Sequence, residues 1–271
     1  MPNPHTIVAI TQTVLYAPLA PFSIFILIRN RDRPPSVTWN CLVLYTCMRL
    51  AGGPVTITYQ NAGGHVEDAP ELYRTSLVLL NVGLVPLLVA THGLVLQVFA
   101  ESRQPASLEG AVLLAKLARA SYLSATLLVG VGDILASDGV NQHTGHLLDT
   151  VGHVMSAATL ALLLWTQVLL WHDRTRHTSV SVKILRYMSC PVPFLTVRTV
   201  YALLYIYTQD DADSTWNPVN GSPVAFALLA LLMEFVVMGL YMWTGLKVPR
   251  RLVSKEDYSL TPRRYHCDDD D

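Results

Sequence analysis

Residues 223–246 read PVAFALLALLMEFVVMGLYMWTGL, an apolar run with a single charged residue, Glu234. An α-helix rises about 1.5 Å per residue, so about 20 residues cross the hydrocarbon core of a bilayer, which is about 30 Å thick. The run is long enough for that crossing, and it is apolar on all sides of the helix. It therefore predicts a membrane-spanning helix with one carboxyl group near its middle.

Six further segments have the same character and decide the fold class. They are residues 6–28, 37–57, 72–99, 111–135, 148–171 and 184–207. Over the whole chain 51% of the residues are hydrophobic and 14% are charged, whereas soluble domains carry about 25% charged residues. Backbone polar groups in lipid must be satisfied within their own segment, so runs of this length form helices. The sequence predicts an all-α, polytopic membrane protein with seven transmembrane helices.

Charged residues near the ends of these segments alternate in sign along the chain. Most of the basic ones lie on one predicted side: Arg29, Arg31, Arg33, Arg103, Lys116, Arg119, Arg174, Arg176, Lys183, Arg186, Lys247, Arg250, Arg251, Lys255, Arg263 and Arg264. The connections on the other side are acidic: Glu67, Asp68, Glu71, Asp138, Asp210, Asp211 and Asp213. Cytoplasmic loops carry the excess of Lys and Arg. We therefore expect the N-terminus outside or in the lumen and the C-terminus in the cytoplasm.

The two parts of the chain differ in composition. Residues 1–248 are expected to form the transmembrane domain, and residues 249–271, which end in four aspartates, a disordered cytoplasmic tail. The four cysteines form no CxxC motif and no pair in an outer loop. Neither a disulfide framework nor a metal site is therefore expected, and no cofactor is predicted.

Ionisable residues inside a membrane are costly and are candidate functional residues by default. In the expected orientation the polar residues of the predicted helices concentrate in the outer half of the bundle: Arg49, Asn81, Asp133, Asp149, His153, Arg198 and Glu234. This one-sided distribution predicts a polar cavity that opens toward the outer or lumenal side. Aromatic residues are concentrated around the last two segments, and Tyr201 is a candidate to line the cavity beside Arg198.

Each of these residues also has a purely structural interpretation. Arg49 and Arg198 could be ion-paired with Asp133 and Glu234 and only hold helices together. Asp149 and His153 are four positions apart, so they share a helix face and could simply hydrogen-bond at the water interface. Glu234 is the hardest to explain in this way, because its neighbours are the most apolar in the chain.

A carboxylic acid in an apolar, aromatic-lined cavity has a definite chemistry. Desolvation disfavours the charged form, so Glu234 is expected to stay protonated and to act as a general acid toward an epoxide or an olefin. Aromatic faces would stabilise the carbocation, and Asp133 or Asp149 would take the final proton. If Arg49 or Arg198 pairs with Glu234, however, Glu234 is ionised and Asp133 takes the acid role.

Three short motifs carry a resemblance: Arg49-Leu-Ala-Gly-Gly53, Arg198-Thr-Val-Tyr201, and Asn217-Pro-Val-Asn-Gly-Ser222 followed by Glu234. In them the chain resembles a fungal family of seven-helix membrane proteins, some of which are encoded among secondary-metabolite genes. In size, topology and intramembrane acids it also resembles the membrane-bound terpene cyclases of fungal meroterpenoid pathways. The resemblance implies cyclisation of a prenylated or epoxidised farnesyl chain without a redox cofactor, in the endoplasmic reticulum membrane. The implied partners are a lipophilic small molecule and the bilayer, with no nucleic acid or protein partner.

Two other functions remain open from the sequence. A seven-helix receptor would have the same topology, and a small-molecule or lipid transporter also uses intramembrane acids and arginines. A transporter is expected to show polar groups through both halves of the bundle, which favours an enzyme or a receptor here. A microbial rhodopsin is excluded, because residues 223–246 contain no lysine for a retinal Schiff base.

Overall fold

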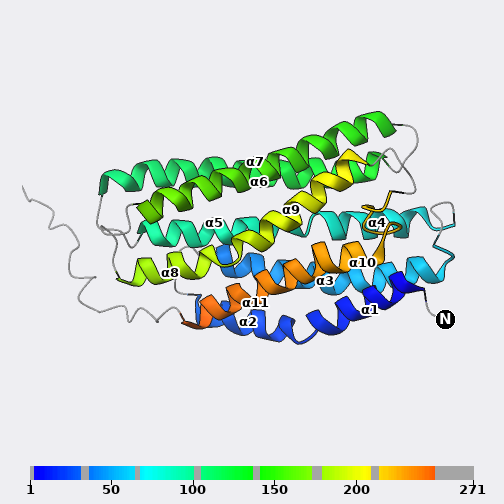
Figure 1. The fold of residues 1–271 in the computed structure, drawn as a ribbon, viewed down its shortest axis with the longest axis horizontal. Coiled ribbons are helices and arrows are strands. Elements are labelled where there is room, and N and C mark those ends of the chain that lie inside the picture. The colour runs from blue at the N-terminus through cyan, green and yellow to red at the C-terminus, as the bar shows by residue number, and fades with distance from the viewer. Residues whose placement is uncertain are drawn as a thin grey trace, which may run out of the picture.

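The computed structural model describes residues 3–31, 37–64, 68–100, 105–136, 141–172, 179–208 and 214–247. These residues form an elongated bundle of roughly parallel and antiparallel helices (Figure 1). The helices are α1 (Pro4–Tyr16), α2 (Leu19–Arg29), α3 (Val37–Asn61), α4 (Pro70–Asn81), α5 (Leu84–Ala100), α6 (Pro105–Ala136), α7 (Gln142–His172), α8 (Ser179–Ser189), α9 (Val192–Tyr207), α10 (Pro223–Phe226), the π-helical segment η2 (Ala227–Leu231) and α11 (Leu232–Lys247).

Six helical stretches of the described residues are long and apolar enough to cross a membrane. They are Pro4–Arg29, Val37–Asn61, Pro70–Val98, Gln142–His172, Ser181–Tyr207 and Pro223–Lys247. A seventh, shorter apolar stretch is Ala120–Ala136 in α6, where the span at 111–135 was predicted. The expectation of an all-helical polytopic membrane protein is thus confirmed, with six full-length spans and one shorter apolar helix.

The described chain begins at one end of the bundle, and α11 finishes at the opposite end (Figure 1). An odd number of crossings requires this arrangement, and seven passes satisfy it. Which end faces the cytoplasm remains a prediction. The predicted cytoplasmic tail, 249–271, lies outside the described residues, as do several of the basic residues used to orient the chain.

Three spans are broken in the middle, and a proline accounts for each break. Pro21, Pro86 and Pro193 lie four residues after Ala17, Val82 and Ser189, where the helices are interrupted. Proline donates no hydrogen bond, and its ring clashes with the carbonyl group four residues earlier. Pro18 also lies at the first of these breaks, and Pro191 lies at the third. Pro54, in contrast, lies inside an uninterrupted α3.

The span formed by α4 and α5 is the centre of the bundle. In its most apolar window 83% of the residues are buried, compared with 22–44% in the other long spans. Helix α5 packs against α3, α6 and α8, and α4 packs against α3 and α6. The break at Val82–Gly83 therefore lies in the protein interior, where freed backbone groups need partners from other helices.

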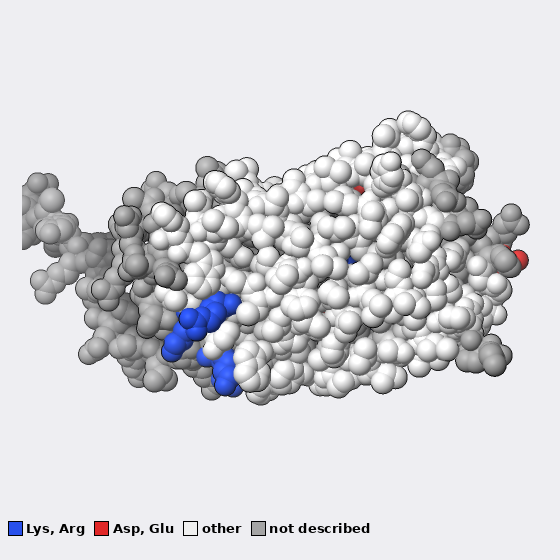
Figure 2. All heavy atoms as spheres, viewed as in Figure 1, with Lys and Arg blue, Asp and Glu red and all other residues white. Residues whose placement is uncertain are grey.

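The outer surface is apolar along most of the bundle. Large exposed side chains include Leu162, Trp165, Val168 and Leu169 of α7, and the middle of the face in Figure 2 is almost wholly white. Basic side chains gather near the end opposite the N-terminus (Figure 2), where α2 and α11 end at Arg29 and Lys247. An apolar belt with charge at its end is the surface that a bilayer requires.

Candidate functional site

All eight site residues predicted from the sequence are buried, with at most 6% of each exposed: Arg49, Asn81, Asp133, Asp149, His153, Arg198, Tyr201 and Glu234. The structure divides them into two neighbouring groups. The arginine–glutamate cluster consists of Arg49, Arg198 and Glu234 with the tyrosines beside them. The aspartate cluster consists of Asn81, Asp133, Asp149 and His153.

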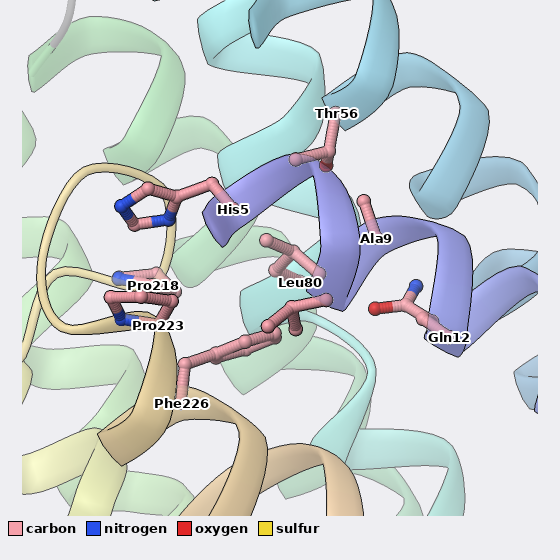
Figure 3. Close-up of a pocket in the computed structure, with 9 residues that line it drawn as sticks. His5, Ala9, Gln12, Thr56, Leu80, Pro218, Pro223 and Phe226 are labelled. Atoms are coloured by element: carbon pink, nitrogen blue, oxygen red, sulfur yellow. The ribbon is translucent and has the colours of Figure 1, made fainter. Parts of the chain in front are cut away.

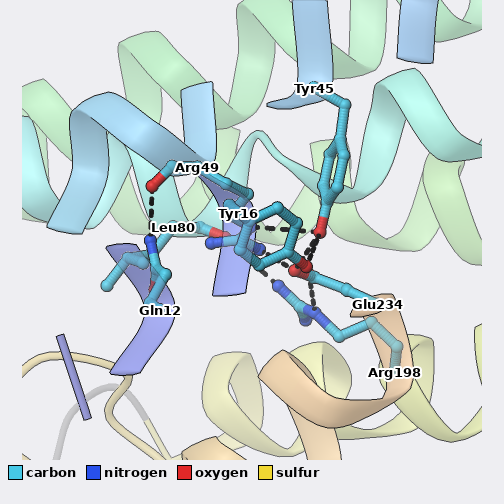
Figure 4. Close-up of polar contacts among 7 residues, drawn as sticks. All are labelled: Gln12, Tyr16, Tyr45, Arg49, Leu80, Arg198 and Glu234. Carbon is cyan, nitrogen blue, oxygen red and sulfur yellow. Dashed lines mark hydrogen bonds and ion pairs between the residues drawn. The ribbon is translucent and has the colours of Figure 1, made fainter. Parts of the chain in front are cut away.

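Glu234 is held by an arginine on each side (Figure 4). Its Oε1 accepts from Nε of Arg198 at 2.6 Å, and its Oε2 forms an ion pair with Nη2 of Arg49. Oε2 also accepts from the hydroxyl of Tyr45 at 2.8 Å. All three charged side chains are at most 3% exposed. With two cations and several hydrogen bonds on one carboxylate, Glu234 is ionised.

The same two arginines bind a backbone carbonyl group at the break between α4 and α5. Nη2 of Arg49 and Nη2 of Arg198 donate to the carbonyl oxygen of Leu80, at 3.3 and 3.2 Å. The end of a helix leaves carbonyl groups without an intrahelical partner, and here the arginines supply one. Gly83 makes room for this contact, because a Cβ atom there would lie 2.9 Å from Nη2 of Arg49.

Aromatic and polar residues of the N-terminal helices complete the arginine–glutamate cluster. The hydroxyl groups of Tyr16 and Tyr45 are 2.8 Å apart, and Gln12 donates to the Arg49 carbonyl at 2.8 Å (Figure 4). The Arg49 guanidinium also lies 5.6 Å from the centre of the Tyr45 ring. These residues are not predicted from the sequence, although Tyr45 precedes Arg49 by four positions and so shares its helix face.

The aspartate cluster joins α4, α6 and α7. Nδ2 of Asn81 lies 3.2 and 3.3 Å from the two carboxyl oxygens of Asp133. Asp149 faces Asp133 across the α6–α7 contact, where Gly132 packs directly on the Asp149 backbone. Nδ1 of His153 is 3.0 Å from both Oδ1 and the carbonyl oxygen of Asp149. Only the carbonyl contact has hydrogen-bond geometry, so Oδ1 of Asp149 has no hydrogen-bond partner among the described residues.

Asp133 and Asp149 are thus two neighbouring buried carboxyl groups, and His153 is a third titratable group 3.0 Å from Oδ1 of Asp149. The arginine–glutamate cluster differs in having two arginines for a single carboxyl group. Both Arg49 and Arg198 contact Glu234. From the sequence, such pairing is the case in which Asp133, and not Glu234, is expected to be the acid.

An apolar cavity lies between α3, α5 and α6. Its volume is about 380 Å³, and its wall includes Cys41, Met48, Val82, Val85, Tyr122 and Thr126. Leu44 and Leu123 also contribute and are 55% and 67% exposed on the apolar outer surface, so the cavity opens toward lipid. Pockets of about 300–1,000 Å³ are typical for small organic ligands.

A second pocket lies near the N-terminal end, between α1, α3, α4 and α10 (Figure 3). His5, Gln12, Thr56, Leu80 and Phe226 are among its lining residues, and its volume is about 10 Å³. That is room for about one water molecule. Of these two pockets, the one with polar residues in its wall is small and the roomier one is apolar, so the polar cavity expected from the sequence stays a prediction.

No group of three or more His, Cys, Asp or Glu side chains within the described ranges could hold a metal ion. Among curated proteins, none matches this chain, and no solved structure matches it either. A family model does match, over residues 3–251 of the 271-residue chain. The chain belongs to the family defined by this domain of unknown function, DUF7702.

Proposed function

We propose that this protein is a membrane-bound terpene cyclase that isomerises a lipophilic prenyl or epoxyprenyl chain by acid catalysis. One observation supports this most strongly. Val82 lines the lipid-facing apolar cavity, and the residue before it, Asn81, donates to the buried carboxyl group of Asp133. At the α4–α5 break, a residue of the cavity wall therefore follows directly on the residue that contacts Asp133.

The proposed chemistry uses Asp133 as the acid and Asp149 as the base. Asp133 gives its proton to an epoxide oxygen, the C–O bond opens, and a neighbouring alkene carbon forms the new C–C bond. The resulting carbocation loses a C–H proton to Asp149, so the product is an isomer of the substrate. Transfer of that proton between the two carboxyl groups restores the starting state. An apolar cavity also excludes the water that would quench the cation.

The arginine–glutamate cluster has a supporting role in this proposal. Arg49 and Arg198 hold the Leu80 carbonyl, and the adjacent Asn81 holds Asp133. Interactions that fix a catalytic group through its neighbour act by orientation. Glu234 is accordingly the counter-ion that keeps both arginines in place, and Asp133 is the acid.

The orientation and location belong to the same proposal. We place the N-terminus in the lumen of the endoplasmic reticulum and the end of α11 in the cytoplasm. This is supported by the basic residues Arg29 and Lys247 at the end opposite the N-terminus, as the distribution of positive charge in membrane proteins requires.

The test is an assay of microsomes that contain the wild type, Asp133→Asn or Asp149→Asn. Epoxyfarnesyl phenols are supplied, and products of unchanged mass are separated by chromatography. We expect cyclised product from the wild type and a loss of at least about 100-fold in Asp133→Asn at equal protein level. Full activity in Asp133→Asn would remove Asp133 from the mechanism. No cyclised product from the wild type, together with substrate uptake into sealed vesicles, would replace the cyclase with a transporter.

A further inference from the structure

The wall of the apolar cavity between α3, α5 and α6 suits a hydrocarbon chain. Among the described residues that line it none is charged, and Met48, Val85 and Val89 are typical members. The hydroxyl group of Thr126 donates to the Tyr122 carbonyl at 2.8 Å, so it is satisfied within α6. A polar ligand would give up its hydrogen bonds to water on entering and regain few of them from this wall.

The mouth of the cavity faces the hydrocarbon of the bilayer. Leu44 of α3 and Leu123 of α6 belong to the wall and are exposed on the outer surface. Both lie in apolar helical stretches, Val37–Asn61 and Ala120–Ala136. An empty cavity would forfeit dispersion contacts along its wall, and the molecules next to its mouth are lipids. Lipid chains therefore have direct access to it.

Along α3 the cavity extends over the depth of one leaflet. Its wall includes Val37, Cys41, Leu44 and Met48, which are spaced three or four residues apart and so form one continuous stripe of the helix. Val37 and Met48 are eleven positions apart, which corresponds to a rise of about 16 Å. Half of the hydrocarbon core of a bilayer is about 15 Å thick. On the neighbouring span the wall reaches Val82, at the α4–α5 break, so the cavity runs from the end of a span to its middle.

The end of the cavity at Val37 lies at the basic end of the bundle. Val37 is the first residue of α3, and a Cβ atom at Gly245 of α11 would lie 2.8 Å from the Trp39 ring. Helix α11 ends two residues later at Lys247, where basic side chains gather on the surface (Figure 2). Basic residues at a membrane surface attract the phosphate groups of lipids. A phospholipid with its headgroup at this end can therefore lay one chain along α3.

We propose that this cavity holds one acyl chain of a phospholipid from the leaflet at the basic end of the bundle. The ester end of the chain lies beside Val37, and its terminal methyl group lies beside Met48 and Val82. The inference does not rest on the proposed cyclase function. A substrate that reaches the cavity from the bilayer enters it by displacing this chain.

The proposal is tested with the full chain in phosphatidylcholine vesicles that contain a low fraction of a photoreactive phospholipid. One probe carries a diazirine near the ester group of an acyl chain, and the other carries it near the terminal methyl group. Crosslinked residues are mapped by mass spectrometry. Cys41→Phe fills part of the cavity, because Cys41 lies in its wall. Cys47→Phe is the matched control, because Cys47 is exposed on the same helix and lies outside the wall.

We expect the first probe to label the wall near Val37 and the second to label it near Met48 and Val82. In Cys41→Phe the labelling of the wall should fall about tenfold, the effect of withdrawing about two methylene groups from it. Labelling of Trp165, which is exposed on α7, should stay unchanged. Cys47→Phe should keep the wild-type pattern.

Three results would overturn the proposal. Labelling in the reverse order would assign the chain to the opposite leaflet. Equal labelling of the wall by the two probes, or wall labelling that Cys41→Phe leaves unchanged, would make the cavity ordinary lipid-exposed surface. The order of labelling in the wild type requires no variant, so it decides the matter even if Cys41→Phe fails to fold. No substrate is present, so failure here and a lack of cyclised product in microsomes are separate results.

Discussion

The two buried clusters of this protein compensate their charges in opposite ways. In the arginine–glutamate cluster, each oxygen of Glu234 meets an arginine. In the aspartate cluster, Asp133 meets the neutral amide of Asn81 and lies near a second carboxyl group, that of Asp149. A buried carboxylate between two cations holds helices together, whereas the proposed mechanism needs the two neighbouring carboxyl groups to share one proton. The comparison therefore assigns stability to the first cluster and, in our proposal, chemistry to the second.

The largest stability effect is expected in the arginine–glutamate cluster. Arg198→Met leaves Glu234 with one cation and removes one of the two donors to the Leu80 carbonyl. Breaking a buried ion pair costs about 3–5 kcal/mol, and thermal unfolding in detergent micelles measures it. The double variant Arg198→Met/Glu234→Gln should lose more than the single one, because it leaves Arg49 as a buried cation without its carboxylate. A single variant as stable as the wild type would show that the pairing does not support the fold.

The next effect concerns the helix break that joins the two clusters. Gly83→Ala places a Cβ atom 2.9 Å from Nη2 of Arg49, and overpacking of this kind costs about 1–3 kcal/mol. Gly239→Ala in α11 is the matched control, because its Cβ would meet nothing within 4 Å. The unfolding temperature should fall for Gly83→Ala and stay or rise for Gly239→Ala. Equal shifts would contradict the tight contact at the break.

A loss of comparable size is expected for Tyr45→Phe. The change removes the hydrogen bond to Glu234 and the contact with the Tyr16 hydroxyl, and a hydrogen bond to a charged group contributes about 1.5–3 kcal/mol. The variant should unfold at a lower temperature and keep most of its cyclisation activity. If the variant lost cyclisation activity but kept the wild-type unfolding temperature, Tyr45 would take part in the reaction. The arginine–glutamate cluster would then not be purely structural.

The smallest stability effect is expected in the aspartate cluster. In the proposed mechanism Asp133 is protonated, so Asp133→Asn replaces it by a neutral group of the same shape. The free energy of unfolding should then change by less than about 1 kcal/mol, while cyclisation is lost. Thermal unfolding and the microsome assay together measure this dissociation. A destabilisation as large as that of Arg198→Met would mean that Asp133 is a structural anion like Glu234.

The sequence predicts the helical class and the buried polar residues well, for a physical reason. Apolar length alone identifies a membrane helix, and an ionisable residue such as Glu234 within that length must face the protein interior. It is harder to predict which buried charged residues pair with each other, because this depends on how each helix is rotated and which helices are in contact. Whether Arg49 reaches Glu234 or Asp133 is decided by packing across four helices, which periodicity does not encode.

The break at Val82–Gly83 shows the same limit. Pro86 indicates a kink, but the sequence does not show that two arginines from distant helices will bind the carbonyl of Leu80. The apolar cavity is also hidden from the sequence, because its wall consists of ordinary apolar residues such as Val85 and Met48. One clue was available for Tyr45, whose spacing from Arg49 puts both on one helix face.

The most direct test of the account asks which carboxyl group carries the buried proton. Infrared difference spectra of the purified protein record the C=O stretching band of a protonated carboxylic acid, for the wild type, Asp133→Asn and Glu234→Gln. The account predicts that this band disappears in Asp133→Asn and remains in Glu234→Gln. A band that persists in Asp133→Asn and is lost in Glu234→Gln would contradict it and return the acid role to Glu234.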